Sequence, residues 1–265
     1  MSSIIFLGTS GGNAVSKQIQ SAAGIIIQIG ELQFHLDPGP GALSKAKEYG
    51  INLNRNTAVL VSHNHINHCS ELNPVIDAMT HCGIDHRGMV LASKSVVLGN
   101  EEMTPALTKY HALMPEKIIP MEKSHKVGID LVEIHALSVE HSDPTAIGFK
   151  FFCPKFTLSY TGDTKVTPAL LEELAGTDIL IMNVPYPGNK AMGMNLDTES
   201  AIKIVGQIKP KVAVLTHFGF EMYKAGILEE AREIQRTTGV PTLAAKDGLL
   251  LYPESYTSKS PVKGF

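Results

Sequence analysis

The stretch that decides the fold lies at residues 58–68 and reads Ala58-Val59-Leu60-Val61-Ser62-His63-Asn64-His65-Ile66-Asn67-His68. Its first four residues are apolar and predict a buried strand. The histidines follow where this strand passes into a helix, a place where α/β proteins build ligand sites. Because alternate residues past a strand end point to the same side, His63 and His65 can bind one ion together, and His68 can turn toward a second. We therefore interpret the stretch as part of a metal centre rather than as a polar surface loop.

The overall composition excludes several classes of protein. The chain has 265 residues, a formal net charge of -3 and 18% charged residues, against about 25% in an average soluble protein. This balance argues against a broad basic face for nucleic acid, and 43% hydrophobic residues suffice for a large core. The apolar runs are short and no signal-peptide pattern opens the chain, so we expect neither a membrane span nor export. Three cysteines, an odd and sparse set, favour free thiols and a cytoplasmic location.

Apolar runs separated by turn residues predict an α/β fold with two sheets and helices on their outer faces. We expect strands over residues 4–7, 24–29, 32–36, 57–62, 89–92, 127–136, 146–152, 156–160, 178–182, 212–216, 242–244 and 249–252. We expect helices over residues 41–49, 71–79, 106–113, 167–174, 198–208 and 227–237. Thr167 and Pro168 predict one helix start, as N-cap and first helical residue. Residues 1–252 are expected to form a single domain, followed by a polar tail over residues 253–265 that frays.

Three further polar residues follow predicted strands elsewhere in the chain: His141, Asp163 and His217. A lone histidine or aspartate at a strand end is more often a plain loop residue. Together with the histidine loop, however, these residues make four strand-end elements that each offer an imidazole or a carboxylate. The sequence therefore predicts that one edge of the fold collects metal ligands.

Five ordered motifs give the chain a resemblance to a known family. They are the histidine loop of residues 63–68 and the segments Leu36-Asp37-Pro38-Gly39, His141-Ser142-Asp143-Pro144-Thr145-Ala146-Ile147-Gly148-Phe149, Tyr160-Thr161-Gly162-Asp163-Thr164 and Leu215-Thr216-His217-Phe218-Gly219. With these motifs, residues 3–252 resemble the metallo-β-lactamase superfamily, most closely its archaeal hydrolase branch related to ribonuclease Z. The resemblance implies a four-layer αββα sandwich of two mixed sheets, with the metal ions at one edge.

The resemblance also implies which residues bind metal. The ligands it assigns are His63, His65 and His141 for the first ion, His68 and His217 for the second, and Asp163 as a bridge between them. Asp37 resembles the family carboxylate that lies behind the ligands and orients a ligand histidine. Asp247 is a weaker candidate for a similar supporting role, and a plain turn residue is the alternative for both aspartates.

The sequence departs from the family pattern at three positions that handle protons. The loop normally reads His-x-His-x-Asp-His, and Asn67 stands in place of its aspartate. An amide oxygen can still bind a metal ion, but it is neutral and takes no proton, so we expect the second ion to bind more weakly. Asn183 and Asn195 stand where the ribonuclease Z branch carries a glutamate and a histidine for proton transfer. The alternative is that Asn67 is a tolerated ligand in an ordinary two-metal site.

The leading hypothesis is a metal-dependent hydrolase in which a metal-activated water attacks a phosphodiester, ester or lactam-like bond. Asp163 would orient that water, and Asn67 or Asn195 could donate a hydrogen bond to the developing oxyanion. A metal-binding scaffold or regulatory protein with little hydrolytic activity is the alternative, because asparagine occupies the proton-transfer positions. An oxidoreductase ranks last, since the relatives that bind iron and dioxygen usually carry acidic ligands and a separate flavin domain.

Zinc is the expected metal, as one or two ions, with manganese or iron as alternatives. We expect a small-molecule or nucleotide-like substrate. The chain has no long Gly/Pro-rich insertion of the kind with which ribonuclease Z grips tRNA, so tRNA is not the expected substrate. The sequence leaves open whether the chain forms a homo-oligomer.

Overall fold

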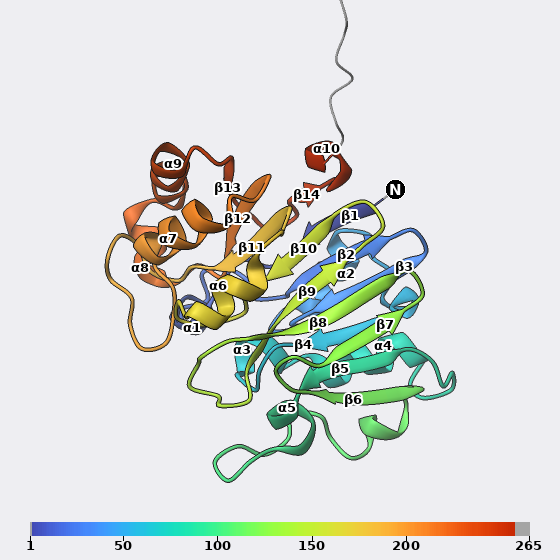
Figure 1. Cartoon of the computed structure of the whole chain (residues 1–265). Helices are drawn as coiled ribbons and strands as arrows, with labels where there is room; N and C mark the ends of the chain where they lie inside the picture. The colour runs from blue at the N-terminus through green and yellow to red at the C-terminus, as the bar shows by residue number, and fades with distance from the viewer. Residues whose placement is uncertain (1, 258–265) are drawn as a thin grey trace, which may run out of the picture.

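The computed structural model describes residues 2–257, apart from the side chains of residues 15 and 16, and contains two seven-stranded sheets that pack face to face (Figure 1). The first sheet has the order β14-β1-β2-β3-β4-β5-β6. Its strands are β1 (Ser2–Phe6), β2 (Ile25–Ile29), β3 (Leu32–Leu36), β4 (Ala58–Val61), β5 (Met89–Ser93), β6 (Lys117–Met121) and β14 (Leu250–Leu251). From β3 to β6 the neighbouring strands run parallel, so their carboxyl ends meet at one edge.

The second sheet has the order β13-β12-β11-β10-β9-β8-β7. Its strands are β7 (Lys126–Ile129), β8 (Val132–Ser138), β9 (Ile147–Phe152), β10 (Thr157–Tyr160), β11 (Ile179–Asn183), β12 (Val212–Thr216) and β13 (Thr242–Ala244). Strands β7 to β10 are antiparallel and strands β10 to β13 are parallel, so this sheet is mixed like the first. The carboxyl ends of β10, β11 and β12 consequently share one edge.

Helices cover the outer face of each sheet. Helices α2 (Ala42–Glu48), α4 (Leu72–Thr80) and α5 (Lys94–Leu98) pack on the first sheet, and α6 (Pro168–Leu174), α7 (Thr198–Ile208) and α9 (Ile227–Thr238) pack on the second (Figure 1). Alternation along a strand builds these layers: Ile4 and Phe6 face the core between the sheets, whereas Ile5 faces the helices. The predicted four-layer αββα sandwich is confirmed.

The remaining helices are short. They are α1 (Gly12–Ser16), α3 (Ile66–Cys69), α8 (Phe220–Ala225), α10 (Glu254–Thr257) and the 3-10 turns η1 (Leu53–Arg55) and η2 (His111–Leu113). At the start of α6, Thr167 accepts a hydrogen bond from the Leu170 amide and Pro168 takes the first turn, as predicted. Among residues 2–257, no helix is long and apolar enough to cross a membrane.

The predicted helix over residues 106–113 is wrong, and only η2 forms there. The side chain of Asn73 donates to the Ala106 carbonyl and accepts from the Thr108 amide, so it satisfies backbone groups that a helix would otherwise pair. Helix α5 and strand β6, which flank this segment, were not predicted.

Two other boundaries differ from the prediction. The single strand expected over residues 127–136 is the hairpin β7–β8, which turns at Asp130 with a φ of 52°. The expected fraying of the tail is not seen at α10, where the Glu254 carboxylate accepts hydrogen bonds from the Ser2 amide and hydroxyl. Residues 258–265 of that predicted tail lie outside the described part of the chain.

Candidate metal centre

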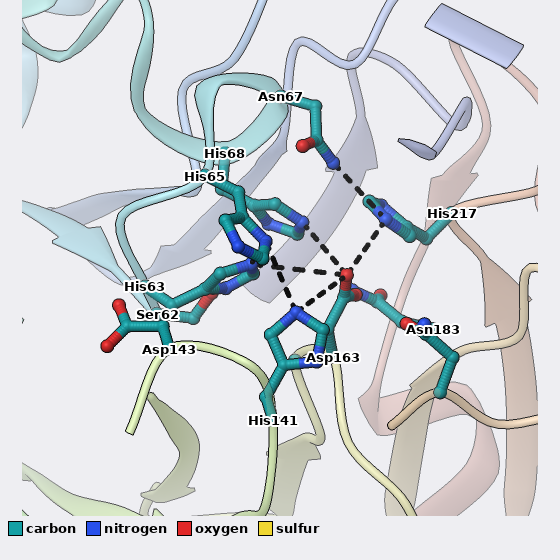
Figure 2. A network of polar contacts seen from close by, with 12 residues as sticks. Ser62, His63, His65, Asn67, His68, His141, Asp143, Asp163, Asn183 and His217 are labelled. Atoms are coloured by element: carbon teal, nitrogen blue, oxygen red, sulfur yellow. Dashed lines mark hydrogen bonds and ion pairs between the residues drawn. The ribbon is translucent and has the colours of Figure 1, made fainter. Parts of the chain in front are cut away.

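Five histidines and one aspartate converge where the two sheets meet at their carboxyl ends (Figure 2). His63 and His65 follow β4, and His68 lies on α3, the short helix that continues the same loop. The other three side chains follow strands of the second sheet: His141 after β8, Asp163 after β10 and His217 after β12. The structure thus brings together side chains that are up to 154 positions apart in the sequence.

The first cluster consists of His63, His65 and His141. The Nδ1 atom of His65 lies 2.9 Å from His63 Nε2 and 3.2 Å from His141 Nε2. All three ligand atoms lie within 4.8 Å of one another. Three imidazole nitrogens at this spacing are a typical set of zinc ligands.

The second cluster consists of His68, His217 and Asn67, and Asp163 lies between the two clusters. Its Oδ2 atom is 3.3 Å from His217 Nε2 and 3.5 Å from His68 Nε2. On the side of the first cluster, the same oxygen is 3.8 Å from His141 Nε2 and 4.0 Å from His63 Nε2. One carboxylate oxygen therefore faces four imidazoles, the position that the predicted bridge requires (Figure 2).

In three of the histidines, a hydrogen bond to Nδ1 determines that Nε2 is the ring nitrogen left to bind a metal ion. The Nδ1 atom of His68 donates to Asp37 at 2.8 Å, and that of His141 donates to the Met194 carbonyl at 3.0 Å. His63 Nδ1 lies 3.0 Å from the Ser62 hydroxyl, whose own proton is given to Asp37. In its neutral form, each of these rings would therefore present an unprotonated Nε2 atom to the centre, as metal-binding histidines do.

A buried nitrogen at this centre fits a bound cation. His68 is 1% exposed, and its Nε2 atom has no hydrogen-bond partner among the described residues. Such an orphaned buried nitrogen is costly unless something other than a hydrogen bond satisfies it. Imidazole nitrogens and a carboxylate around the same point suit a borderline divalent ion such as Zn²⁺. The residues present therefore fit a divalent metal.

The charges around His68 favour a positive ion at the same place. Burial lowers the pKa of His68, but the facing carboxylates of Asp163 and Asp37 outweigh burial and raise this pKa to about 10. Burial raises the pKa of the Asp163 carboxyl, yet His217 and His68 hold it well below its usual range. Burial, reinforced by the charge of His68, lowers the pKa of His63. A divalent ion would supply the positive charge that these carboxylates stabilise.

Asp37 contacts the ligand set from behind. It follows β3 in a left-handed conformation, with a φ of 52°, and is 4% exposed. Besides His68, it accepts hydrogen bonds from the Ser62 amide, the Ser62 hydroxyl and the Tyr160 hydroxyl, each at 2.7 Å. These are the contacts that its predicted orienting role requires.

His217 packs against a glycine in the loop after β1. Its φ is 62°, and the ring lies against Gly11. A Cβ atom at position 11 would lie 2.3 Å from the His217 ring and 2.4 Å from its carbonyl oxygen. The Gly11 amide also donates to the Phe218 carbonyl, so the loop after β1 supports the loop after β12.

The three asparagines have different surroundings. The amide nitrogen of Asn67 lies 3.3 Å from His217 Nε2, which places Asn67 at the second cluster. Asn183 is 1% exposed and donates to Asp163, so it lies behind the ligands. Asn195 lines the open pocket and donates to the Met192 carbonyl.

Asp247, the weaker candidate for a supporting role, makes no hydrogen bond to a histidine among the described residues. Its carboxylate accepts hydrogen bonds from the Thr9 amide and hydroxyl and from the Ser21 hydroxyl. Because the Thr9 carbonyl accepts from the Phe218 amide, Asp247 supports the loop beside His217 rather than a ligand itself.

Sequence reasoning missed several supporting groups. Tyr160, Ser62 and the Met194 carbonyl, which hold Asp37, His63 and His141, were not predicted. Tyr160 gave a weak signal, since its phenol stands at the end of the strand that leads into the Asp163 motif. A backbone carbonyl such as that of Met194 leaves no trace in the sequence.

A pocket of about 200 Å³ opens onto the centre. It is lined by Gly11, Gly12, Asn13, His65, Asn67, His141, Ser142, Asp163, Pro185, Tyr186, Asn195 and His217. None of these described lining residues is a lysine or an arginine. The polar groups that line the pocket are imidazoles, amides, hydroxyls and the Asp163 carboxylate.

Comparisons with known proteins find a family model, relatives in sequence and similar solved structures. The Beta-lactamase superfamily domain matches residues 33–218. An uncharacterized protein of Methanocaldococcus jannaschii is 32% identical over 249 residues, which cover 93% of both chains. A ribonuclease Z of Methanopyrus kandleri is 21% identical over 285 residues, covering 93% of this chain and 96% of the relative. Among solved structures, the metallo-beta-lactamase fold protein YhfI from Bacillus subtilis superimposes with a TM-score of 0.78 at 18% identity, covering 94% of this chain and 98% of that one.

Proposed function

The chain belongs to the metallo-β-lactamase superfamily, and from this premise we propose that it is a metal-dependent hydrolase of small phosphodiesters. One observation carries the proposal: a single oxygen of Asp163 lies 3.3 to 4.0 Å from four imidazoles on the wall of an open pocket. Most members of the superfamily are metal-dependent hydrolases. We expect His63, His65 and His141 to hold one ion, His68, His217 and Asn67 to hold the other, and Asp163 to contact both.

Bound divalent ions would polarise the scissile group and lower the pKa of a water molecule toward neutrality. The protein's own residues would orient the reactants. Asp163 can accept a hydrogen bond from that water, while the amides of Asn67 and Asn195 can donate to the oxygen on which charge develops.

Proton delivery is the weak point of this site. Among the described residues that line the pocket, Asp163 is the sole carboxylate, and it faces the imidazoles. The amides of Asn67 and Asn195 neither take nor give a proton at neutral pH. We therefore expect the protein to prefer substrates whose leaving group needs little protonation.

The similarity to a ribonuclease Z motivates the phosphodiester class. A pocket of about 200 Å³ suits a small diester or nucleotide-like group better than a folded RNA. We propose zinc as the metal because imidazole dominates the ligand set. The free cysteines Cys69, Cys82 and Cys153 are consistent with action in a reducing cytoplasm.

The test is hydrolysis of bis(4-nitrophenyl) phosphate by protein purified without chelator and then supplied with Zn²⁺ or Mn²⁺. We expect turnover that disappears with chelation and in His65→Ala. The control is His86→Ala, which removes an exposed histidine from the turn after α4. Turnover that survives in His65→Ala would contradict the proposal.

A metal-binding scaffold is the second candidate. It is favoured by asparagine at positions 67, 183 and 195, of which the first contacts His217 and the second contacts Asp163. Full metal occupancy without turnover over a broad panel of esters, diesters and lactams would support it instead.

A further inference from the structure

Asn183 lies at the carboxyl end of β11, directly behind Asp163 (Figure 2). Its side-chain nitrogen donates to Asp163 Oδ1 at 2.7 Å and to the Tyr160 hydroxyl at 3.0 Å. Both amide hydrogens are thus in use, while the Asn183 oxygen has no partner among the described residues. An ionised carboxylate only accepts hydrogen bonds, so the NH₂ group and not the oxygen must face Asp163.

The acceptor on the other side is also fixed. Tyr160 is 3% exposed, and its hydroxyl donates a hydrogen bond to Asp37 at 2.7 Å. It can therefore only accept from Asn183. A continuous chain of hydrogen bonds results, from His68 through Asp37, Tyr160 and Asn183 to Asp163.

This chain of bonds gives the two oxygens of Asp163 different tasks. Oδ1 receives the Asn183 hydrogen bond, whereas Oδ2 faces the imidazoles of both clusters. A carboxylate without such a bond can rotate and offer both oxygens to one ion. We propose that Asn183 is a positioning residue that holds Oδ1 away from the metal centre, so that Oδ2 alone serves both clusters.

In this chain the amide of Asn183 makes a contact that an ionised carboxylate could not make. An ionised aspartate or glutamate there could not donate to Asp163 and would place a second negative charge beside it. The inference rests on the metal centre of the proposed function, but not on the reaction that the centre performs.

The test is Co²⁺ binding to the full chain, followed by the visible d–d absorption of the ion and by competition with a chelator. Asn183→Leu removes both donors at similar size. We expect Co²⁺ affinity to fall about 10- to 100-fold, the usual effect of losing a partner behind a metal ligand, and the d–d bands to change as Oδ1 becomes free to coordinate. Asn183→Thr is a second variant, to be used if leucine prevents folding. The threonine hydroxyl is one bond closer to the backbone than the asparagine nitrogen and does not reach Asp163, so we expect the same changes.

The matched control is Asn56→Leu. Asn56 is 0% exposed, accepts from Gln33 and precedes β4 at the opposite end from the metal centre. We expect its loss to lower the thermal midpoint while leaving the Co²⁺ spectrum and affinity within about threefold of the parent. Parent-like spectra and affinity in a folded Asn183 variant, or the same spectral change in Asn56→Leu, would overturn the proposal. A changed spectrum in a protein that hydrolyses no phosphodiester would overturn the proposed function and leave this inference standing.

Discussion

The two clusters of the metal centre obtain their charge in different ways. The first cluster is three imidazoles, and His141 is held there by a neutral backbone carbonyl. The second cluster has two imidazoles and the neutral Asn67, but its His68 donates to the buried carboxylate Asp37. The second cluster therefore lacks a carboxylate at position 67 but has the Asp37 carboxylate hydrogen-bonded to His68. The comparison teaches that Asp37 contacts the second cluster directly, whereas it reaches the first only through the neutral Ser62 hydroxyl.

Removing the group that both clusters share should have the largest effect. In Asp163→Ala, we expect both ions to be lost, with affinity at least about 100-fold lower, because the residue faces four imidazoles. Metal content after gel filtration measures this effect. Asp178→Asn is the control, since that carboxylate accepts from the Thr157 amide at the other end of β11. Retention of one tightly bound ion in Asp163→Ala would mean that the clusters are independent.

Asp37→Asn should separate the two clusters. The variant keeps the shape of Asp37 but removes its charge, so we expect affinity for the second ion to fall about 10- to 100-fold while the first ion stays. Titration of the metal-free protein with Zn²⁺ resolves the two binding steps. Equal weakening of both steps would contradict the comparison, and it would point to Ser62, which links Asp37 to His63.

Asn67→Asp should make the second cluster resemble the family pattern. Here we expect tighter binding of the second ion and about tenfold faster turnover of activated phosphodiesters, since general-base assistance is typically worth ~10²–10⁴-fold. Rates are measured against metal concentration for both forms. If the rates at saturating metal agree within about twofold, Asn67 is an adequate ligand and the missing carboxylate does not limit the reaction.

The smallest effect concerns a buried histidine outside the clusters. Burial lowers the pKa of His35 to about 4, despite a hydrogen bond to the Ala23 carbonyl and the nearby Asp37 charge, whereas carboxylates raise that of His68. The unfolded chain takes up a proton at His35 near pH 6.5 and the folded chain only near pH 4, so folding stability falls as the pH drops between these values. From pH 7 to pH 5.5, His35 should cost about 1 kcal/mol. Urea denaturation of the metal-free protein measures this loss of unfolding free energy. The loss between pH 7 and pH 5.5 should be about 1 kcal/mol smaller in His35→Gln than in the parent. Equal losses in the two proteins would contradict the role given to His35.

The fold and much of the centre could be predicted from local signals. His63 and His65 stand in a short pattern that follows a buried strand. The order of the apolar runs predicts two sheets with helices on their outer faces, and the resemblance to the metallo-β-lactamase superfamily implies the four-layer sandwich. The loop over residues 106–113 could not be predicted, because Asn73, far away in sequence, pairs with its backbone. From the sequence alone, Asn183 is expected to be a lost proton-transfer group. Its position at a strand end is visible in the sequence, whereas its hydrogen bond to Asp163 is visible only in the structure.

The central claim is that five histidines and Asp163 form one metal centre with a strong and a weak half. Elemental analysis of protein purified without added metal or chelator, beside the His63→Ala/His65→Ala variant, tests it most directly. We expect between one and two ions per parent chain, with the second lost first on dialysis, and no tightly bound ion in the double variant. Full metal content in the double variant would contradict the account.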